Sequence, residues 1–374
     1  MKDNRFSFIA RLLFISALAF TGLNCQSARP STTSDQTTAE VVQLKETKVT
    51  FVAVGDMMLS RGVNRAITRA GDPLLPFRKL DSLLKESDFN FGNLESPISG
   101  NDNIIGKGLV FNAHTRDTLG LNAYNFKVLN LANNHALDQR LAGLQNTRRF
   151  LDERGITYLG VGDNMEQAWQ PKFITVNGMN IGFIGASYAS VNDGGVARNN
   201  YVARMEDTAY LRKAIAQIRP RVDFLVVTMH AGVEYTRRPD KGQVNFAHAA
   251  IDAGADMVIG AHPHWVQIKE EYKGKYIFYS LGNFVFDQEW SRDTKEGLAL
   301  KITLRNTEGA AASSSLSPNG ALKKLQTRAQ VEQIEMIPVV IENYSTPRMA
   351  TEPEAEAILR KIGEPTSVLK PQKN

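Results

Sequence analysis

The sequence predicts an α/β fold. Two observations carry the prediction. Short β-branched and apolar runs alternate with stretches whose apolar residues recur at helical spacing, from residue 49 onward. Several of the apolar runs also end in a short polar cluster, and α/β proteins place their chemistry at such strand ends. With 374 residues, 43% of them hydrophobic, the chain can bury a large core.

The net charge gives no reason to expect a nucleic-acid partner. The chain has 44 basic and 39 acidic residues, a formal charge of +5. Part of this charge lies at the start, where Lys2, Arg5 and Arg11 outweigh Asp3. The remainder is spread over a long chain without a dense basic tract, so we expect no binding to nucleic acid.

Residues 1–24 predict a signal peptide. A basic start precedes an apolar stretch at residues 12–23, which is shorter than the ~20 residues of a transmembrane helix and matches a signal-peptide core. The single cysteine, Cys25, follows at once. A lone cysteine is either a buried core thiol or, after an export signal, the lipid-modified first residue of the mature chain. The position of Cys25 favours the lipoprotein, although Asn24 stands where lipoprotein signals carry a small residue.

Lipidation of Cys25 would anchor an exported protein to a membrane, facing the periplasm or the cell exterior. Residues 25–48 are polar without hydrophobic periodicity, which predicts a flexible tether. The folded domain is expected over residues 49–305, and residues 306–374 are expected to complete it.

The first half of this domain alternates strongly. Residues 49–55, 89–91 and 126–132 are apolar runs that predict buried strands. The helices between and after them are expected at 63–70, 80–87 and 141–154. The turn residues Asn177 and Gly178 then separate two further strands, at 172–176 and 181–186.

The second half continues the same pattern. Predicted helices at 207–218 and 243–253 flank a β-branched strand at 222–229, and Gly254 closes the second helix. Later strands are expected at 257–260, 276–281, 298–304 and 331–342, followed by a charged helix at 352–362. Small polar residues predict a loop at 306–322, and the tail beyond Pro365 is expected to be disordered.

Five predicted strands end in polar clusters with metal-binding side chains. Carboxylate and amide oxygens suit hard divalent cations, and imidazole suits borderline transition metals. Two Mn-, Fe- or Zn-type ions sharing a bridging carboxylate need about this many donors. The candidate ligands are Asp56, Glu95, Asn134, His230, His262 and His264.

Each candidate also has an ordinary alternative. Asp56 alone reads equally well as a helix N-cap, and Asn134 as a turn residue. Glu95 alone would be a solvated loop residue, and a single histidine at a strand end is more often hydrogen-bonded structure than a ligand. The coincidence of all five clusters favours one shared metal site.

A set of motifs follows in order over about residues 50–290: Gly55–Asp56, Gly92 to Glu95, Leu131 to His135, His230 to Tyr235, Gly254 to Asp256, Gly260 to His264 and Tyr279 to Phe284. This ordered set resembles the bacterial poly-γ-glutamate capsule biosynthesis proteins of the CapA type. That family is a divergent branch of the calcineurin-like metallophosphoesterases. The resemblance therefore implies a four-layer α/β/β/α sandwich of two mixed sheets.

Carried over to this sequence, the resemblance implies a role for each candidate. Asp56 and His264 would bind a first metal, and Glu95 would bridge two metals. The second metal would be bound by Asn134, His230 and His262. His135 would be the general acid or would stabilise charge near the substrate. The implied supporting or substrate-contacting residues are Asn93, Glu234, Tyr235 and Asn283.

Some positions depart from the superfamily or keep a second interpretation. Met58 stands where the metallophosphoesterases carry a histidine ligand, and a thioether binds hard ions poorly. Glu234 and Tyr235 either support a ligand histidine or end a strand, and Asn283 is a site residue or a turn residue. The basic residues at 237, 238 and 241 either meet a polyanion or form a solvated face.

The resemblance implies a cell-envelope protein that takes part in the synthesis, export or anchoring of an anionic polymer such as poly-γ-glutamate. Two alternatives keep the same site. One is an active hydrolase of phosphate esters or of an amide-linked polymer. The other is a non-catalytic accessory subunit of a membrane polymer synthase, which would add synthase subunits as partners. Met58 leaves catalytic turnover an open question.

Overall fold

A computed structural model describes residues 46–100, 109–188, 200–307 and 328–369. The predicted signal peptide, Cys25 and most of the tether lie outside the described residues, as does most of the predicted loop at 306–322. Contacts group Gln43–Asn374 into one compact unit. In the part of the chain that the structure describes, no helix is long and apolar enough to cross a membrane.

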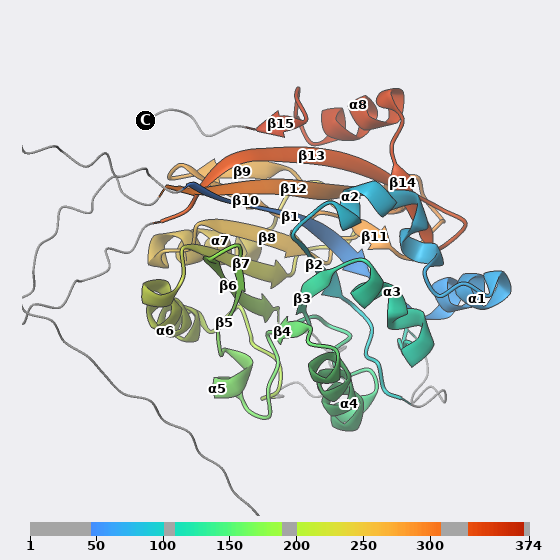
Figure 1. Ribbon diagram of the computed structural model, residues 1–374, viewed down its shortest axis with the longest axis horizontal. Helices are drawn as coiled ribbons and strands as arrows, with labels where there is room; N and C mark the ends of the chain where they lie inside the picture. Colours follow the sequence, from blue (N-terminus) through green and yellow to red (C-terminus); the bar gives the residue numbers. More distant parts are fainter. Residues whose placement is uncertain (1–45, 101–108, 189–199, 308–327, 370–374) are drawn as a thin grey trace, which may run out of the picture. The chain divides into compact units, whose positions relative to one another are not determined.

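The first sheet is mixed and is built around β1 (Glu46–Met57). On one side of β1, parallel strands follow in the order β2 (Phe89–Leu94), β3 (Phe126–Asn130) and β4 (Thr157–Leu159). On the other side, β12 (Glu296–Thr307), β13 (Gln330–Glu342) and β14 (Thr346–Met349) add antiparallel strands. Figure 1 shows β12 between β1 and β13, although β1 is far from both in sequence. The short β11 (Asn283–Val285) pairs with the end of β1.

The second sheet is also mixed. Its parallel centre consists of β6 (Met179–Ser187), β7 (Phe224–His230), β8 (Met257–Ala261) and β10 (Lys275–Phe278). The antiparallel edge strands are β5 (Lys172–Val176) and β9 (Lys269–Tyr272). The buried sequences of β7 and β8 agree with strands that are covered on both faces.

Helices cover the outer faces of both sheets. On the first sheet these are α1 (Arg61–Ala70), α2 (Asp81–Lys85), α3 (Leu119–Ala123) and α4 (Arg140–Glu153). The second sheet is covered by α5 (Met165–Ala168), α6 (Thr208–Ile218) and α7 (Lys241–Ala253). α8 (Glu352–Lys361) packs against β13 (Figure 1). Short 3₁₀ segments occupy Leu75–Leu80, Thr115–Thr118, Arg219–Arg221 and Asp293–Lys295.

The core confirms the predicted four layers. Phe91 of β2 stacks on Phe183 of β6, so the inner faces of the two sheets pack directly on each other. A second cluster joins the outer face of the first sheet to helices and includes Leu144 of α4 and Leu129 of β3. A third joins Val227 of β7 to the helices of the second sheet. The fold is therefore an α/β/β/α sandwich of two mixed sheets.

Local sequence accounts for the ends of α7. Asp240 accepts the backbone N–H of Gln243, whose side chain accepts the N–H of Asp240 in return. At the other end, Gly254 adopts a left-handed conformation with φ 116°. The predicted closure of this helix at Gly254 is confirmed.

The differences from the predicted elements are mostly short strands. β4, β9, β11 and β14 carry too few residues for a clear periodic signal. The tail differs as well: β15 (Val368–Leu369) pairs with β13 in a segment for which the sequence predicts disorder. Ile334 pairs with Leu369 and Glu335 with Val368 there, so backbone pairing with β13 holds the segment.

Candidate metal centre

The predicted ligands lie at the carboxyl ends of strands from both sheets. Asp56 is the next-to-last residue of β1, and Glu95 directly follows β2. Asn134 follows β3, His230 ends β7, and His262 comes directly after β8. Parallel strands end at the same edge of their sheet, and the two sheets bring their edges together here.

The structure brings these side chains into two overlapping groups. One consists of Glu95, His230 and His262, and the other of Asp56, Glu95 and His264. Within each group, one ligand atom of every residue lies within 4.8 Å of the others. Glu95 belongs to both groups, so it stands where a carboxylate shared by two ions would be. Asn134 joins the first group, because its Oδ1 is 2.8 Å from Nε2 of His230.

The donor atoms fit a divalent cation. Both carboxylate oxygens of Glu95 and Nδ1 of His262 are buried and have no hydrogen-bond partner among the described residues. Buried polar atoms in native proteins nearly always have a partner, so three such atoms in one cluster indicate a missing ligand. Oxygen and imidazole nitrogen are donors that Mn, Fe and Zn accept.

The electrostatics agree with this donor set. Burial, and next the charge of Asp56, raises the pKa of Glu95 well above its ordinary value. Burial, and next the charge of His264, lowers the pKa of His262 to about 3. Burial also lowers the pKa of His230 well below its usual range, helped by the charge of His262. Two neutral imidazoles beside a carboxylate without partners are suited to bind a metal cation.

Asn93 connects the two sheets within the centre. Its Nδ2 donates to Oδ1 of Asp56 at 2.8 Å and lies 3.2 Å from Nδ1 of His230. Its own Oδ1 accepts from Nδ2 of Asn130 at 2.9 Å. The resemblance implies a supporting or substrate-contacting role for Asn93, and the structure shows it between the candidate ligands Asp56 and His230. Asn130 is a further supporting residue that the sequence did not single out.

His262 and His264 reach the centre through unusual backbone. Both have positive φ angles, 102° and 58°, which non-glycine residues adopt rarely. The backbone N–H of His262 donates to Oδ2 of Asp56 at 3.2 Å. Nδ1 of His264 lies 2.9 Å from Oδ1 of Asn283 and 3.4 Å from Oδ2 of Asp56. Asn283 thus contacts a candidate ligand, and the strained backbone turns both imidazoles inward.

His135 borders the centre but makes a separate pairing. Its Nδ1 forms a 2.7 Å hydrogen bond with Oδ2 of Asp138, and its Nε2 lies 3.8 Å from Oε1 of Glu95. Its ring stacks on Phe111 at 3.9 Å. The carboxylate of Asp138 was not singled out from the sequence. The signal was its spacing, because residue i+3 faces residue i across a tight turn.

Met58 stands where the metallophosphoesterases carry a histidine ligand, but its sulfur does not point to the centre. The sulfur accepts the backbone N–H of Ser60 at 3.2 Å, and the side chain is fully buried in the apolar cluster under α1. Met58 is therefore part of the core. The group of Asp56, Glu95 and His264 forms without it.

Glu234 and Tyr235 lie in the loop after β7, so neither ends a strand. Tyr235 faces His264 with 6.0 Å between ring centroids and packs against Trp290 at 4.8 Å. Burial, and next the charge of Glu234, raises the pKa of Tyr235 to about 12. Glu234 is exposed, and its charge is one of the causes that raise the pKa of Glu95, after burial and Asp56.

Arg237, one of the basic residues after His230, contributes to packing. Its guanidinium lies over the ring of Trp265, 4.9 Å from the centroid, and pairs with Asp293. It also donates to the carbonyl of Val266 at 2.9 Å. A solvated face is therefore wrong for this residue, and its charge is already used within the protein.

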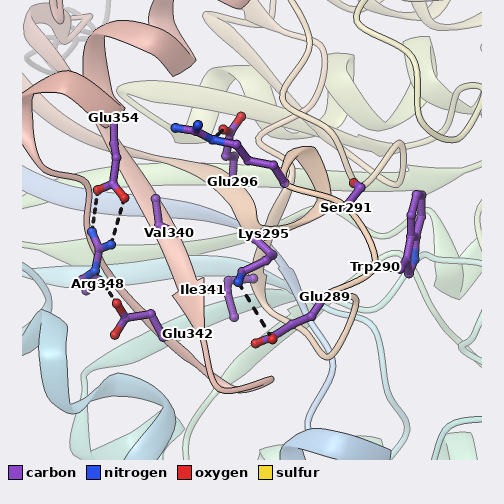
Figure 2. Close-up of a pocket in the computed structure, with 11 residues that line it drawn as sticks. Glu289, Trp290, Ser291, Lys295, Glu296, Val340, Ile341, Glu342, Arg348 and Glu354 are labelled. Carbon is purple, nitrogen blue, oxygen red and sulfur yellow. Dashed lines mark hydrogen bonds and ion pairs between the residues drawn. The ribbon is translucent and has the colours of Figure 1, made fainter.

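A separate pocket lies between the loop at 289–296 and strands β13 and β14 (Figure 2). Its volume is about 450 Å³, and its charged side chains pair with one another. Arg348 binds both Glu342 and Glu354, at 2.7 Å each, and Lys295 lies 3.9 Å from Glu289. The six candidate ligands do not line it. The pocket is therefore distinct from the metal centre.

The chain matches solved structures at low similarity. The chain is similar to the NAD nucleotidase of Haemophilus influenzae, with a TM-score of 0.47, 11% identity, and 85% of this chain and 62% of that one covered. It is also similar to a 5'-nucleotidase of Candida albicans, with a TM-score of 0.42, 11% identity, and 67% and 48% of the chains covered. At such low identity no activity is carried over from them.

Comparison of sequences finds relatives of higher identity. The profile of the family described as "Bacterial capsule synthesis protein PGA_cap" matches residues 50–288. The capsule biosynthesis protein CapA of Bacillus anthracis is 33% identical over 276 residues, 72% of this chain and 67% of that protein. The PGA biosynthesis protein CapA of Bacillus subtilis is 32% identical over 259 residues, 68% of each chain. The matched segment contains every candidate ligand, and the chain belongs to the PGA_cap family of bacterial capsule synthesis proteins.

Proposed function

We propose that this protein takes part in the synthesis, export or anchoring of an anionic γ-glutamyl polymer at the cell envelope, and that a divalent-metal centre serves this task. The proposal rests on the position and surroundings of Glu95. It is shared by two groups of ligand-type side chains, and both of its oxygens are buried without partners. Membership of a capsule synthesis family supplies the class of polymer.

The proposed centre holds one or two ions of the Mn, Fe or Zn type. Asp56, Glu95 and His264 would hold the first ion. Glu95 would be shared with the second, together with the ligands Asn134, His230 and His262. Bound ions of this kind polarise an oxygen of the substrate and lower the pKa of water.

The remaining residues of the centre would bind, orient and transfer protons. His135 would hold or donate a proton at Nε2, on the side that faces Glu95. Asp138 would keep the ring in place through Nδ1. Asn283 would orient His264, and Asn93 would orient Asp56.

Two other functions use the same centre, and each has one observation in its favour. The paired His135 and Asp138 favour an active hydrolase of phosphate esters or amide-linked polymers, because such a pair suits general acid catalysis. The sulfur of Met58, turned to the backbone where a ligand would be expected, favours an accessory subunit of a membrane synthase.

We also propose that the protein is exported and attached to a membrane through Cys25. The basic start, the apolar stretch at 12–23 and the polar segment after Cys25 support this. Mass spectrometry of the protein from its host tests it. A mature chain that begins at Cys25 and carries acyl groups is expected, and an uncleaved chain would contradict it.

Metal analysis tests the centre. Purified protein supplied with Mn or Zn is expected to retain at least one equivalent of metal, and a Glu95→Gln variant much less. His248→Ala is the matched control, because His248 lies on α7 and pairs with Glu270 outside the centre. Less than about half an equivalent in the wild-type protein would contradict a metal-dependent function.

Activity then separates the alternatives. The metal-loaded protein is incubated with a γ-glutamyl polymer and with a phosphodiester such as bis(p-nitrophenyl) phosphate. Cleavage of either one that is lost in Glu95→Gln supports a hydrolase. No cleavage by a fully loaded protein, with loss of capsule in cells that carry Glu95→Gln, supports the polymer-assembly role.

A further inference from the structure

Arg61 is a cation at the edge of the metal centre that the proposed function leaves without a task. We propose that Arg61 binds a carboxylate of the polymer, one repeat away from the group at the metal centre. The inference rests on the proposed function, because it assumes that a γ-glutamyl chain lies across the centre. In such a chain every repeat carries one free carboxylate, so a second anion always lies close to the first.

The position of Arg61 is set by two aromatic rings. Its guanidinium lies 4.6 Å from the centroid of Phe111 and 6.0 Å from that of Phe286. Each ring also contacts a histidine of the centre. Phe111 stacks on His135 at 3.9 Å, and Phe286 packs against His264 at 4.9 Å. Arg61 is thus beside both histidines but separated from them by a ring, which suits a neighbouring anion better than the reacting group.

The guanidinium has donors to offer. Asp287 accepts from Nη2 and Nε is buried, so Nη1, which has no acceptor among the described residues, is the donor left for a ligand. About a quarter of the side chain, 26%, remains exposed, so a ligand can reach it. Arginine presents its N–H groups as a planar fork that matches the two oxygens of a carboxylate. A partly exposed fork with a donor left over is suited to such an anion.

Arg61 is also held in place in advance. Oδ2 of Asp287 accepts the backbone N–H of Gly62 at 2.8 Å, while its other oxygen accepts from Arg61. A Cβ atom at Gly62 would lie 2.6 Å from Cβ of Asp287, so only glycine permits this approach. Arg61 itself has a φ of 46°, which costs energy in a non-glycine residue. Strained backbone beside a fixed ion pair is typical of a binding site rather than of a solvated helix end.

Isothermal titration calorimetry on the full-length, Mn-loaded protein tests the inference. The probes are a γ-linked glutamate trimer and inorganic phosphate, which needs only the metal centre. Arg61→Ala is expected to weaken trimer binding about tenfold, the effect of losing a charge-assisted hydrogen bond, and to leave phosphate binding unchanged. Arg61→Lys keeps the charge without the fork and is expected to fall between. Arg65→Ala is the control, because Arg65 is an exposed arginine on the same helix.

Three results would overturn the inference. In the first, the trimer binds Arg61→Ala as tightly as it binds the wild type. In the second, the trimer does not bind the Mn-loaded wild type. In the third, Arg61→Ala weakens phosphate binding as much as it weakens trimer binding. Should Arg61→Ala fail to fold, the comparison of Arg61→Lys with Arg65→Ala decides in the same way. Failure of the proposed function is seen separately, as a wild-type protein that takes up no Mn.

Discussion

His135 and Asp138 form a buried pair, with Nδ1 of the imidazole 2.7 Å from Oδ2 of the carboxylate. The same oxygen accepts the backbone N–H of Phe111 at 2.6 Å. Asp138 therefore fixes both the ring of His135 and the chain segment that carries the ring stacked on it. With Nδ1 donating to Asp138, the opposite nitrogen is directed to Glu95.

The first prediction concerns this pair. Asp138→Ala removes the acceptor, so neutral His135 should shift its proton from Nδ1 to Nε2, the tautomer that free histidine prefers. Asp138→Asn keeps an acceptor oxygen and is expected to retain the proton on Nδ1. ¹⁵N NMR of the imidazole distinguishes the two forms. A wild-type protein with neutral His135 protonated at Nε2 would show that Asp138 does not set the tautomer.

The second prediction concerns Glu95 and has opposite signs with and without metal. A buried carboxylate without partners destabilises the metal-free fold. Glu95→Gln should therefore raise the melting temperature of the metal-free protein at pH 7, by about 2 °C for each kcal/mol. With Mn added, the wild type should melt higher while the variant stays unchanged. Differential scanning calorimetry measures both, and a metal-free variant that melts several degrees lower would refute the prediction.

The third prediction concerns Asn283. Its side chain holds Nδ1 of His264, and loss of such a supporting contact weakens metal binding about 10- to 100-fold. Asn283→Ala is expected to show this loss in a Zn or Mn titration. Gln288→Ala serves as the control, because Gln288 contacts Asn283 but not His264. Equal affinities of the two variants would mean that Asn283 does not orient the ligand.

The fourth prediction concerns pH and Glu354. Hydrogen bonds from Arg348, and then from the backbone of Thr351, lower the pKa of Glu354 to about 2. Because the folded pKa is below the unfolded value near 4.5, its stabilisation is present above pH 4.5 and is lost as the pH falls toward 2. Glu354→Gln should lower stability by about 1 kcal/mol at pH 7, since the pair is partly exposed, and by less at pH 3.

Thermal melting at the two pH values measures this difference. Glu356→Gln is the matched control, because Glu356 is on the same helix and meets Arg360 only at 3.9 Å. A Glu354→Gln effect that is as large at pH 3 as at pH 7 would contradict the assignment of the lowered pKa.

The sequence predicts the parallel strands of both sheets well, because their signal is local. The run from Val222 to Met229 is β-branched and apolar except for Asp223, and its residues from Phe224 onward are buried in β7. The polar residues after such runs were enough to predict that the six candidate ligands share one site. Parallel strands share one carboxyl edge, so the position of each cluster in the sequence already determines its end of the sheet.

Non-local features were not predictable in this way. β11 has three residues and exists because Asn283 pairs with Asp56, more than two hundred residues earlier. The left-handed backbone at His262 and His264 has no composition signal, since glycine is absent at both positions. Met58 depended on tertiary packing too: only the structure shows its sulfur turned to Ser60.

The origin of the candidate ligands has a mechanical consequence. Asp56 and Glu95 come from the first sheet, whereas His230 and His262 come from the second. A bound ion would thus add a cross-link between the two sheets, beside their apolar core and hydrogen bonds such as those of Asn93. An ion at a hundred times its dissociation constant adds about 2.7 kcal/mol to the folded state. Removal of the ion by a chelator should then first weaken the contact between the two sheets. The amide protons of β2 and β7 are expected to exchange faster before either sheet unfolds.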